Sequence, residues 1–134
     1  MPGYSGTPLP KKLGIKEGFR VSFTNAPWDV VAELKPSLEK CRFADGAKSP
    51  LDLAMIFATS AASLTKNFKR AAKQLTPSGM LWISWPKKSS GVATDLNENV
   101  VRDIGLAAGL VDVKVCAVTD VWSGLKFVRR LKDR

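Results

Sequence analysis

Residues 82–95 read Trp-Ile-Ser-Trp-Pro-Lys-Lys-Ser-Ser-Gly-Val-Ala-Thr-Asp. An apolar, strand-like run stops at a proline, a basic loop rich in hydroxyl groups follows, and a helical pattern begins directly after it. A loop that leaves the carboxyl end of a strand and enters a helix presents free backbone N–H groups, and open α/β sheets hold anionic ligands at such places. The stretch therefore predicts an α/β sheet with a candidate anion site, but it names no reaction.

Strand-like and helix-like patterns alternate on both sides of this stretch. The expected strands span residues 20–24, 41–44, 51–58, 80–85, 113–118 and 125–128. Four helices are expected. The first is short and ends at Gly14, and the second runs from Pro27 to Lys35-Pro36. The third runs from Thr59 or Ser60 to Pro77-Ser78-Gly79, and the fourth spans 95–108, with a capping box of Asp95 and Glu98 at its start and Gly109 at its end. The order predicts a three-layer, Rossmann-like α/β sandwich whose mostly parallel sheet finishes in a C-terminal antiparallel hairpin.

The length and composition fit one soluble domain. The chain has 134 residues, of which 45% are hydrophobic and 25% charged, and it contains no internal repeat. We expect a single domain over 1–134, with an N-terminal arm (1–18) packed on the body and a basic tail (129–134). The sequence shows neither a signal peptide nor an apolar run long enough for a membrane span, so the expected location is the cytoplasm, without membrane contact.

The residue types limit the possible chemistry. The chain has no histidine, which removes the usual general base and the Ser-His and Cys-His nucleophile pairs. Cys41 and Cys116 have no metal-ligand spacing and are interpreted as reduced core thiols. We therefore expect no metal and no cofactor, and a binding protein rather than an enzyme. A lysine, a carboxylate, a cofactor or a metal held by carboxylates alone would still permit catalysis.

The excess of positive charge favours an acidic partner. Lys and Arg together number 21 against 12 Asp and Glu, a formal net charge of +9. Lys66, Lys69, Arg70 and Lys73 recur at helical spacing, and further basic residues crowd the C-terminus. This pattern is typical of a solvated helix face, and the alternative that we keep is a nucleic-acid surface.

Polar and basic residues follow several of the predicted strands. The loops after residues 24, 58 and 85 should leave one edge of the sheet, together with the turn that contains Trp122. They would line one pocket for a small anionic or nucleotide-like ligand, with Asn25, Trp28, Thr59, Ser60, Lys87, Lys88, Ser89, Ser90, Gly91, Thr94 and Trp122 as its candidate residues. The plainer interpretation is that these are surface lysines, helix caps and packing tryptophans.

A parallel sheet finished by an antiparallel hairpin resembles the class I S-adenosylmethionine-dependent methyltransferases. That resemblance implies a glycine-rich turn after the first strand, where this chain has Phe23-Thr24-Asn25-Ala26-Pro27-Trp28 and no glycine. It also implies an acidic residue after the second strand, for which Asp45 is a loose candidate in a predicted loop. A degenerate methyltransferase-like protein is therefore a further alternative, for which we expect no binding of S-adenosylmethionine.

Across almost its whole length, the chain is similar to a small bacterial family described only as a domain of unknown function. The similarity rests on Tyr4-Ser5-Gly6-Thr7-Pro8-Leu9, Lys11-Lys12-Leu13-Gly14-Ile15, Trp85-Pro86-Lys87-Lys88, Ser90-Gly91-Val92-Ala93-Thr94-Asp95-Leu96, Gly109-Leu110-Val111-Asp112-Val113-Lys114-Val115-Cys116-Ala117 and Trp122-Ser123-Gly124-Leu125-Lys126. It implies a bacterial cytoplasmic protein and assigns no activity, cofactor or catalytic residue.

Overall fold

One mixed sheet organises the molecule in the computed structural model, which describes residues 6–44 and 49–134. Within these residues six strands lie in the order β2-β1-β3-β4-β6-β5. Their bounds are β1 (Arg20–Thr24), β2 (Arg42–Phe43), β3 (Leu51–Phe57), β4 (Leu75–Pro86), β5 (Leu110–Ala117) and β6 (Trp122–Arg129). The pairs β2-β1, β1-β3 and β3-β4 are parallel, whereas β6 runs antiparallel to both β4 and β5. The predicted Rossmann-like sheet with its C-terminal hairpin is confirmed.

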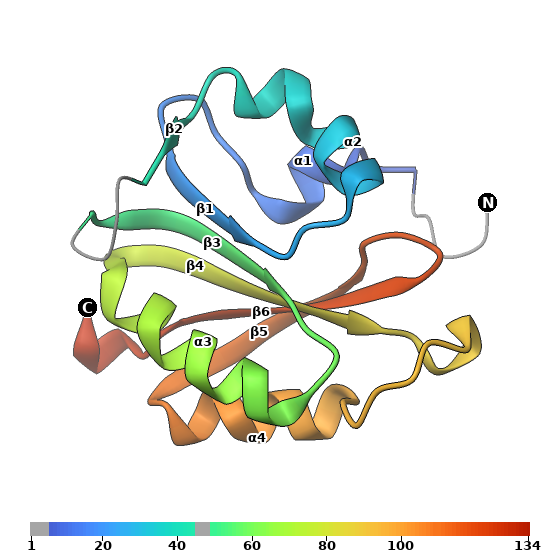
Figure 1. The fold of residues 1–134 in the computed structure, drawn as a ribbon. Coiled ribbons are helices and arrows are strands. Elements are labelled where there is room, and N and C mark those ends of the chain that lie inside the picture. Colours follow the sequence, from blue (N-terminus) through green and yellow to red (C-terminus); the bar gives the residue numbers. More distant parts are fainter. Residues whose placement is uncertain (1–5, 45–48) are drawn as a thin grey trace.

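Helices cover both faces of the sheet (Figure 1). The short helix α1 (Leu9–Leu13) and α2 (Trp28–Leu38) lie on one face, and α3 (Ala61–Gln74) and α4 (Glu98–Ala107) lie on the other. Strand β4 shows why two cores form. Its side chains alternate between the faces, so Trp82 packs in the core under α1 and α2, and Trp85 packs in the core under α3 and α4. None of the described helices is long and apolar enough to cross a membrane.

Helix α2 does not end where the sequence predicts. The Lys35-Pro36 pair was expected to stop it, but it continues through Pro36 to Leu38. Proline removes only one N–H from a helix, and here the loss falls in the last turn, where the Pro36 ring is exposed. The buried side chains of Leu34 and Leu38 hold that turn against the sheet.

The junction between α3 and β4 also differs from the prediction. Pro77-Ser78-Gly79 was expected to be a connecting turn, but the helix ends at Gln74 and β4 begins at Leu75. Leu75 pairs with Leu51 and Met80 pairs with Leu53, so residues 76–79 form an irregularity inside the strand. A side chain at Gly79 would place its Cβ 2.8 Å from the carbonyl oxygen of Leu51, which explains the glycine.

The start of α4 is shifted toward the C-terminus. The helix was predicted from Asp95 with a capping box, but Asn97 is its N-cap and accepts a hydrogen bond from Val100 N at 2.9 Å. Asp95 instead accepts from the backbone N–H of Ala61, the first residue of α3, at 2.8 Å. The cap prediction was wrong because Asp95 serves the neighbouring helix. The predicted ends at Gly14 and Gly109 are confirmed, since both glycines have left-handed φ angles, +79° and +92°.

Candidate ligand-binding site

The loops that follow β1, β3 and β4 leave the same edge of the sheet, because these strands are parallel neighbours. The β5–β6 turn reaches this edge too, since Trp122 at the start of β6 lies opposite Pro86 at the end of β4. We call this edge the carboxyl edge. It is the part of an open α/β sheet where ligands usually bind.

The loop after β4 is folded back on itself. Residues Lys88–Ser90 form one turn of 3-10 helix, and Gly91 follows with a left-handed φ of +76°. The Ser90 hydroxyl donates to the carbonyl of Lys87 at 2.6 Å, and Lys87 N–H donates to the carbonyl of Val121 at 2.7 Å in the hairpin turn. The two lysines therefore stand on a backbone that is fixed at both ends.

A second set of contacts joins this loop to the start of α3. The Thr94 hydroxyl donates to the carbonyl of Thr59 at 2.6 Å and accepts from Leu96 N–H at 3.0 Å. The Asp95 carboxylate accepts from Ala61 N–H, as described above. The predicted residues Thr59 and Thr94 are thus brought together, but both of these groups already have protein partners.

A cavity of about 550 Å³ opens beside this loop. Its described lining residues are Trp85, Pro86, Lys87, Lys88, Val92, Thr94, Leu96, Asn97, Glu98 and Ser123. Glu98 pairs with Arg102, whose guanidinium lies 2.6 Å from its carboxylate and 2.9 Å from that of Asp112. Lys87 and Lys88 form no ion pair with any residue that the structure describes. The cavity therefore combines two uncompensated cations with the N-terminus of α4.

The other predicted site residues do not line this cavity. Ser60 caps α3 by accepting from Ser63 N–H at 3.2 Å. Trp122 packs edge-on against the ring of Phe57, with centroids 5.2 Å apart. Ser89, Ser90 and Gly91 form the turn beside the cavity. Asn25 lies in the β1–α2 turn, and Trp28 is the first residue of α2.

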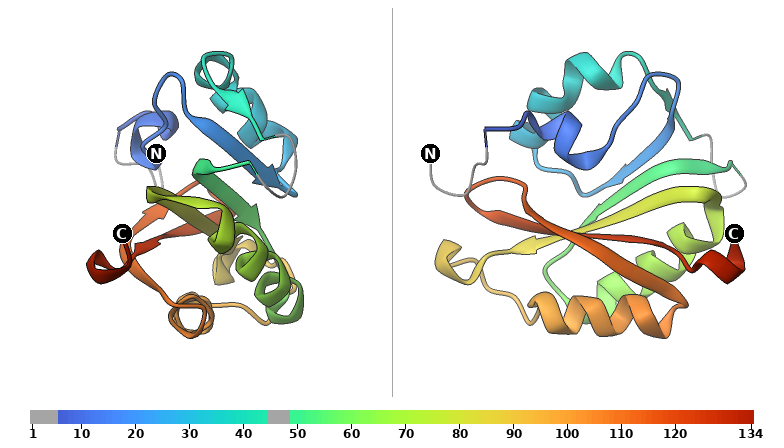
Figure 2. Two further views of the ribbon diagram at one scale, coloured as in Figure 1. Left: turned by 90° about the vertical axis from the view of Figure 1, so that its left-hand side faces the viewer. Right: turned by 180° about the vertical axis from the view of Figure 1, so that it is seen from behind.

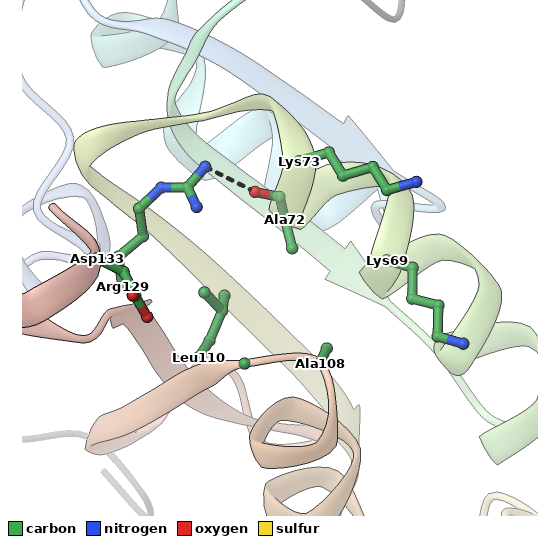
Figure 3. A pocket seen from close by; sticks show the side chains of 8 residues that line it. Lys69, Ala72, Lys73, Ala108, Leu110, Arg129 and Asp133 are labelled. Carbon is green, nitrogen blue, oxygen red and sulfur yellow. Dashed lines mark hydrogen bonds between the residues drawn. The ribbon is translucent and has the colours of Figure 1, made fainter.

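The predicted basic row lies on α3, and all four of its side chains are exposed. A cavity of about 410 Å³ adjoins it at the opposite edge of the sheet, lined by Lys69, Ala72, Lys73, Ala108, Gly109, Leu110, Arg129 and Asp133 (Figure 3). Arg129 donates to the carbonyl oxygens of Ala72 at 3.1 Å and Leu75 at 2.7 Å. It therefore caps the last turn of α3. Local sequence patterns do not indicate this contact, because it joins positions more than fifty residues apart.

The residues that the structure describes include no group of three Cys, Asp or Glu side chains placed to hold a metal ion. Cys41 and Cys116 are free thiols, and both are partly buried. Burial raises the pKa of each, and at Cys116 the nearby Lys12 and Lys114 lower the pKa again in part. Neither thiol has the low pKa of a reactive cysteine.

Comparison with known proteins identifies the fold. No family model and no curated protein matches the sequence. The structure is similar to a fibrillarin pre-rRNA processing protein from Methanococcus jannaschii, with 13% identity and a TM-score of 0.55 over 92% of this chain and 69% of that one. It is also similar to a magnesium protoporphyrin IX methyltransferase from Synechocystis with bound SAH, with 11% identity and a TM-score of 0.59 over 90% and 78% of the two chains. A putative methyltransferase from Thermoplasma acidophilum gives 8% identity and a TM-score of 0.58 over 93% and 75%.

The chain thus has the fold of S-adenosylmethionine-dependent methyltransferases, which raises the question of their cofactor. In the turn after β1 the residue with a left-handed backbone is Asn25, with φ +58°, whereas the resemblance to class I methyltransferases implies a glycine-rich turn there. Pro27 follows at the N-cap of α2 and has no N–H to offer a ligand. Asp45 lies outside the described residues. The described part of this turn does not fit the cofactor, so no methyl-transfer step follows from it.

Proposed function

We propose that this protein is a non-catalytic binding module on a methyltransferase-like fold, and that it holds a small anionic or nucleotide-like ligand in the carboxyl-edge cavity. The observation that carries the proposal is the pair Lys87 and Lys88, which line this cavity without an ion-pair partner in the described chain. The proposal treats the chain as a cytoplasmic member of the small bacterial family that its motifs resemble.

The surroundings of the two lysines support an anion rather than a neutral ligand. The first turn of α4 begins in the cavity wall at Asn97 and Glu98, and the leading N–H groups of a helix have no partner inside it. They attract negative charge, and Lys–phosphate contacts are charge-assisted hydrogen bonds. The uncharged part of such a ligand could contact the remaining lining residues, which include Ser123 and the apolar side chains of Trp85 and Leu96.

Backbone-amide NMR spectra of the intact chain, recorded with a panel of nucleotides and phosphate esters, test the proposal. We expect the amides of residues 87–97 to shift. The double variant Lys87→Gln/Lys88→Gln should bind about tenfold or more weakly, because two charge-assisted contacts are lost. Lys132→Gln, at the exposed C-terminus, is the matched control and should bind normally. Unmoved amides in this loop with the fold intact would remove the proposal.

A second candidate function is contact with nucleic acid through α3. The exposure of all four predicted side chains, Lys66, Lys69, Arg70 and Lys73, favours it, as does the cavity that continues from Lys73 to Arg129. Binding to duplex DNA or RNA should then weaken steeply with salt, and the variant Lys69→Glu/Arg70→Glu should abolish it. Binding that is absent, or independent of salt, would contradict this candidate.

A further inference from the structure

Two of the sequence motifs that the proposed site does not use meet in space. Lys11-Lys12-Leu13 lies on α1, and Lys114-Val115-Cys116-Ala117 ends β5, about a hundred residues later. The Lys12 ammonium donates to the carbonyl of Ala117 at 3.3 Å, and the buried indole of Trp82 donates to the carbonyl of Leu13 at 2.9 Å. Both views of Figure 2 show α1 beside the β5–β6 hairpin. The arm is therefore attached to the sheet at this point.

A cavity of about 440 Å³ lies between the arm and the edge strand β5. It is lined by Thr7, Lys11, Lys12, Lys114, Val115, Cys116 and Ala117. These described lining residues include three lysines and no carboxylate. Lys11 and Lys114 are exposed and form no ion pair with the described part of the chain. We call this the arm cavity, and it shares no lining residue with the carboxyl-edge cavity.

A fourth lysine adds to the positive charge of this region. Lys126 on β6 lies directly opposite Lys114 in the strand register. Partial burial, and secondarily the charge of Lys114, lower the pKa of the Lys126 ammonium. Like charges directly opposite each other on neighbouring strands are unfavourable, and no described carboxylate pairs with either of them. A bound anion would relieve this repulsion.

We propose that the arm cavity binds a multiply charged phosphate group, such as the diphosphate part of a larger ligand. The exposed lysines that line it, Lys11 on α1 and Lys114 on β5, belong to two different elements, and each ammonium offers up to three hydrogen-bond donors. Lys12 adds positive charge between them, although its ammonium already donates to Ala117. A compact anion with several charges can contact them together, whereas a single carboxylate cannot. The cavity is large enough for a diphosphate and part of the group attached to it. This inference does not depend on the proposed function of the carboxyl edge.

Cys116 offers a local readout for occupancy of the arm cavity. It lines the cavity, and Lys12 and Lys114 both act on the pKa of its thiol. An anion held by these lysines should lower the rate at which Cys116 is alkylated, both by covering the thiol and by opposing formation of the thiolate. Cys41, which does not line the cavity, is the internal control.

The experiment titrates the intact chain with inorganic pyrophosphate, using calorimetry for binding and mass spectrometry for alkylation of each thiol. We expect binding at low salt, slower alkylation of Cys116 and no change at Cys41. Lys114→Gln and Lys11→Gln should each weaken binding about five- to tenfold, because one charge-assisted contact is lost. Lys66→Gln, an exposed lysine on the far helix layer, should leave binding unchanged.

The Lys87→Gln/Lys88→Gln variant separates this inference from the proposed function. It should keep the pyrophosphate protection of Cys116, whatever it does to ligands at the carboxyl edge. If pyrophosphate fails to bind, or binds without slowing the alkylation of Cys116, the arm cavity is not a phosphate site. Equal weakening by Lys66→Gln and Lys114→Gln would also overturn the inference, since it would show attraction by net charge alone.

Discussion

Replacing Trp82 with phenylalanine tests how firmly the N-terminal arm is fixed to the sheet. Trp82 is fully buried, and its indole N–H donates to the carbonyl of Leu13 at 2.9 Å. The substitution Trp82→Phe removes the donor and leaves that carbonyl buried without a partner, which costs about 1–3 kcal/mol. It also leaves space where the larger ring stood, which adds a smaller penalty.

The same strand supplies the control for this prediction. Trp85 is 5% exposed, packs on the opposite face of β4 and has no hydrogen-bond partner for its indole N–H in the described chain. Trp85→Phe removes the same atoms without breaking such a bond. Urea unfolding should therefore show Trp82→Phe to be less stable than Trp85→Phe by about 1–3 kcal/mol. Equal losses in the two variants would refute the idea that this hydrogen bond holds the arm.

Three further predictions concern packing, charge and the cofactor. Gly105→Ala should destabilise the fold by about 1–3 kcal/mol in urea unfolding, despite a helix-propensity gain of about 1 kcal/mol, because the new Cβ would lie 2.5 Å from Cζ of the buried Phe127 ring. The double variant with Phe127→Leu should recover part of the loss. Lys126→Met should raise the unfolding free energy at neutral pH, because the lowered pKa of Lys126 shows that its charge is unfavourable in the folded state. This gain should shrink as the pH rises toward 10.5, the ordinary pKa of lysine, because Lys126 then loses its proton in the folded and unfolded states alike. Calorimetry with millimolar S-adenosylmethionine should show no heat of binding, because the turn that contains Asn25 lacks the cofactor glycines; measurable heat abolished by Asn25→Val would contradict this expectation.

The sequence was sufficient for the order of layers and for most of the strands. Hydrophobic runs and turn residues report on local backbone structure, and the buried run of β3 and the hairpin of β5 and β6 were predicted from them. The errors occurred where tertiary contacts override local preference. Buried Leu38 carries α2 past Pro36, and Asp95 caps a helix that begins thirty-four residues earlier in the chain rather than its own.

The candidate sites show the same limit. Lys87 and Lys88 were predictable because the strand, loop and helix that hold them are consecutive in sequence. The arm cavity was not predictable, because its lysines lie on two segments that are far apart in the sequence, and each segment alone has the pattern of an ordinary surface element. Their meeting depends on the indole of Trp82, which fixes α1 over the hairpin, and on Ala117, whose carbonyl accepts from Lys12.

The fold and the β1 turn together favour one side of the carboxyl edge for binding. The methyltransferase-like sheet brings the loops after β1, β3 and β4 to one edge, but the β1 turn contains Asn25 and Pro27 and does not fit S-adenosylmethionine. Lys87 and Lys88 beside β4, and Lys11 and Lys114 beside β5, have no ion-pair partner among the described residues and lie toward the hairpin side of the sheet. Beside β5, the partly buried Lys126 lies opposite Lys114, so desolvation and like-charge repulsion both disfavour its charge in the folded chain. Both proposals therefore place an anionic ligand on the hairpin side of the sheet and not at the β1 turn.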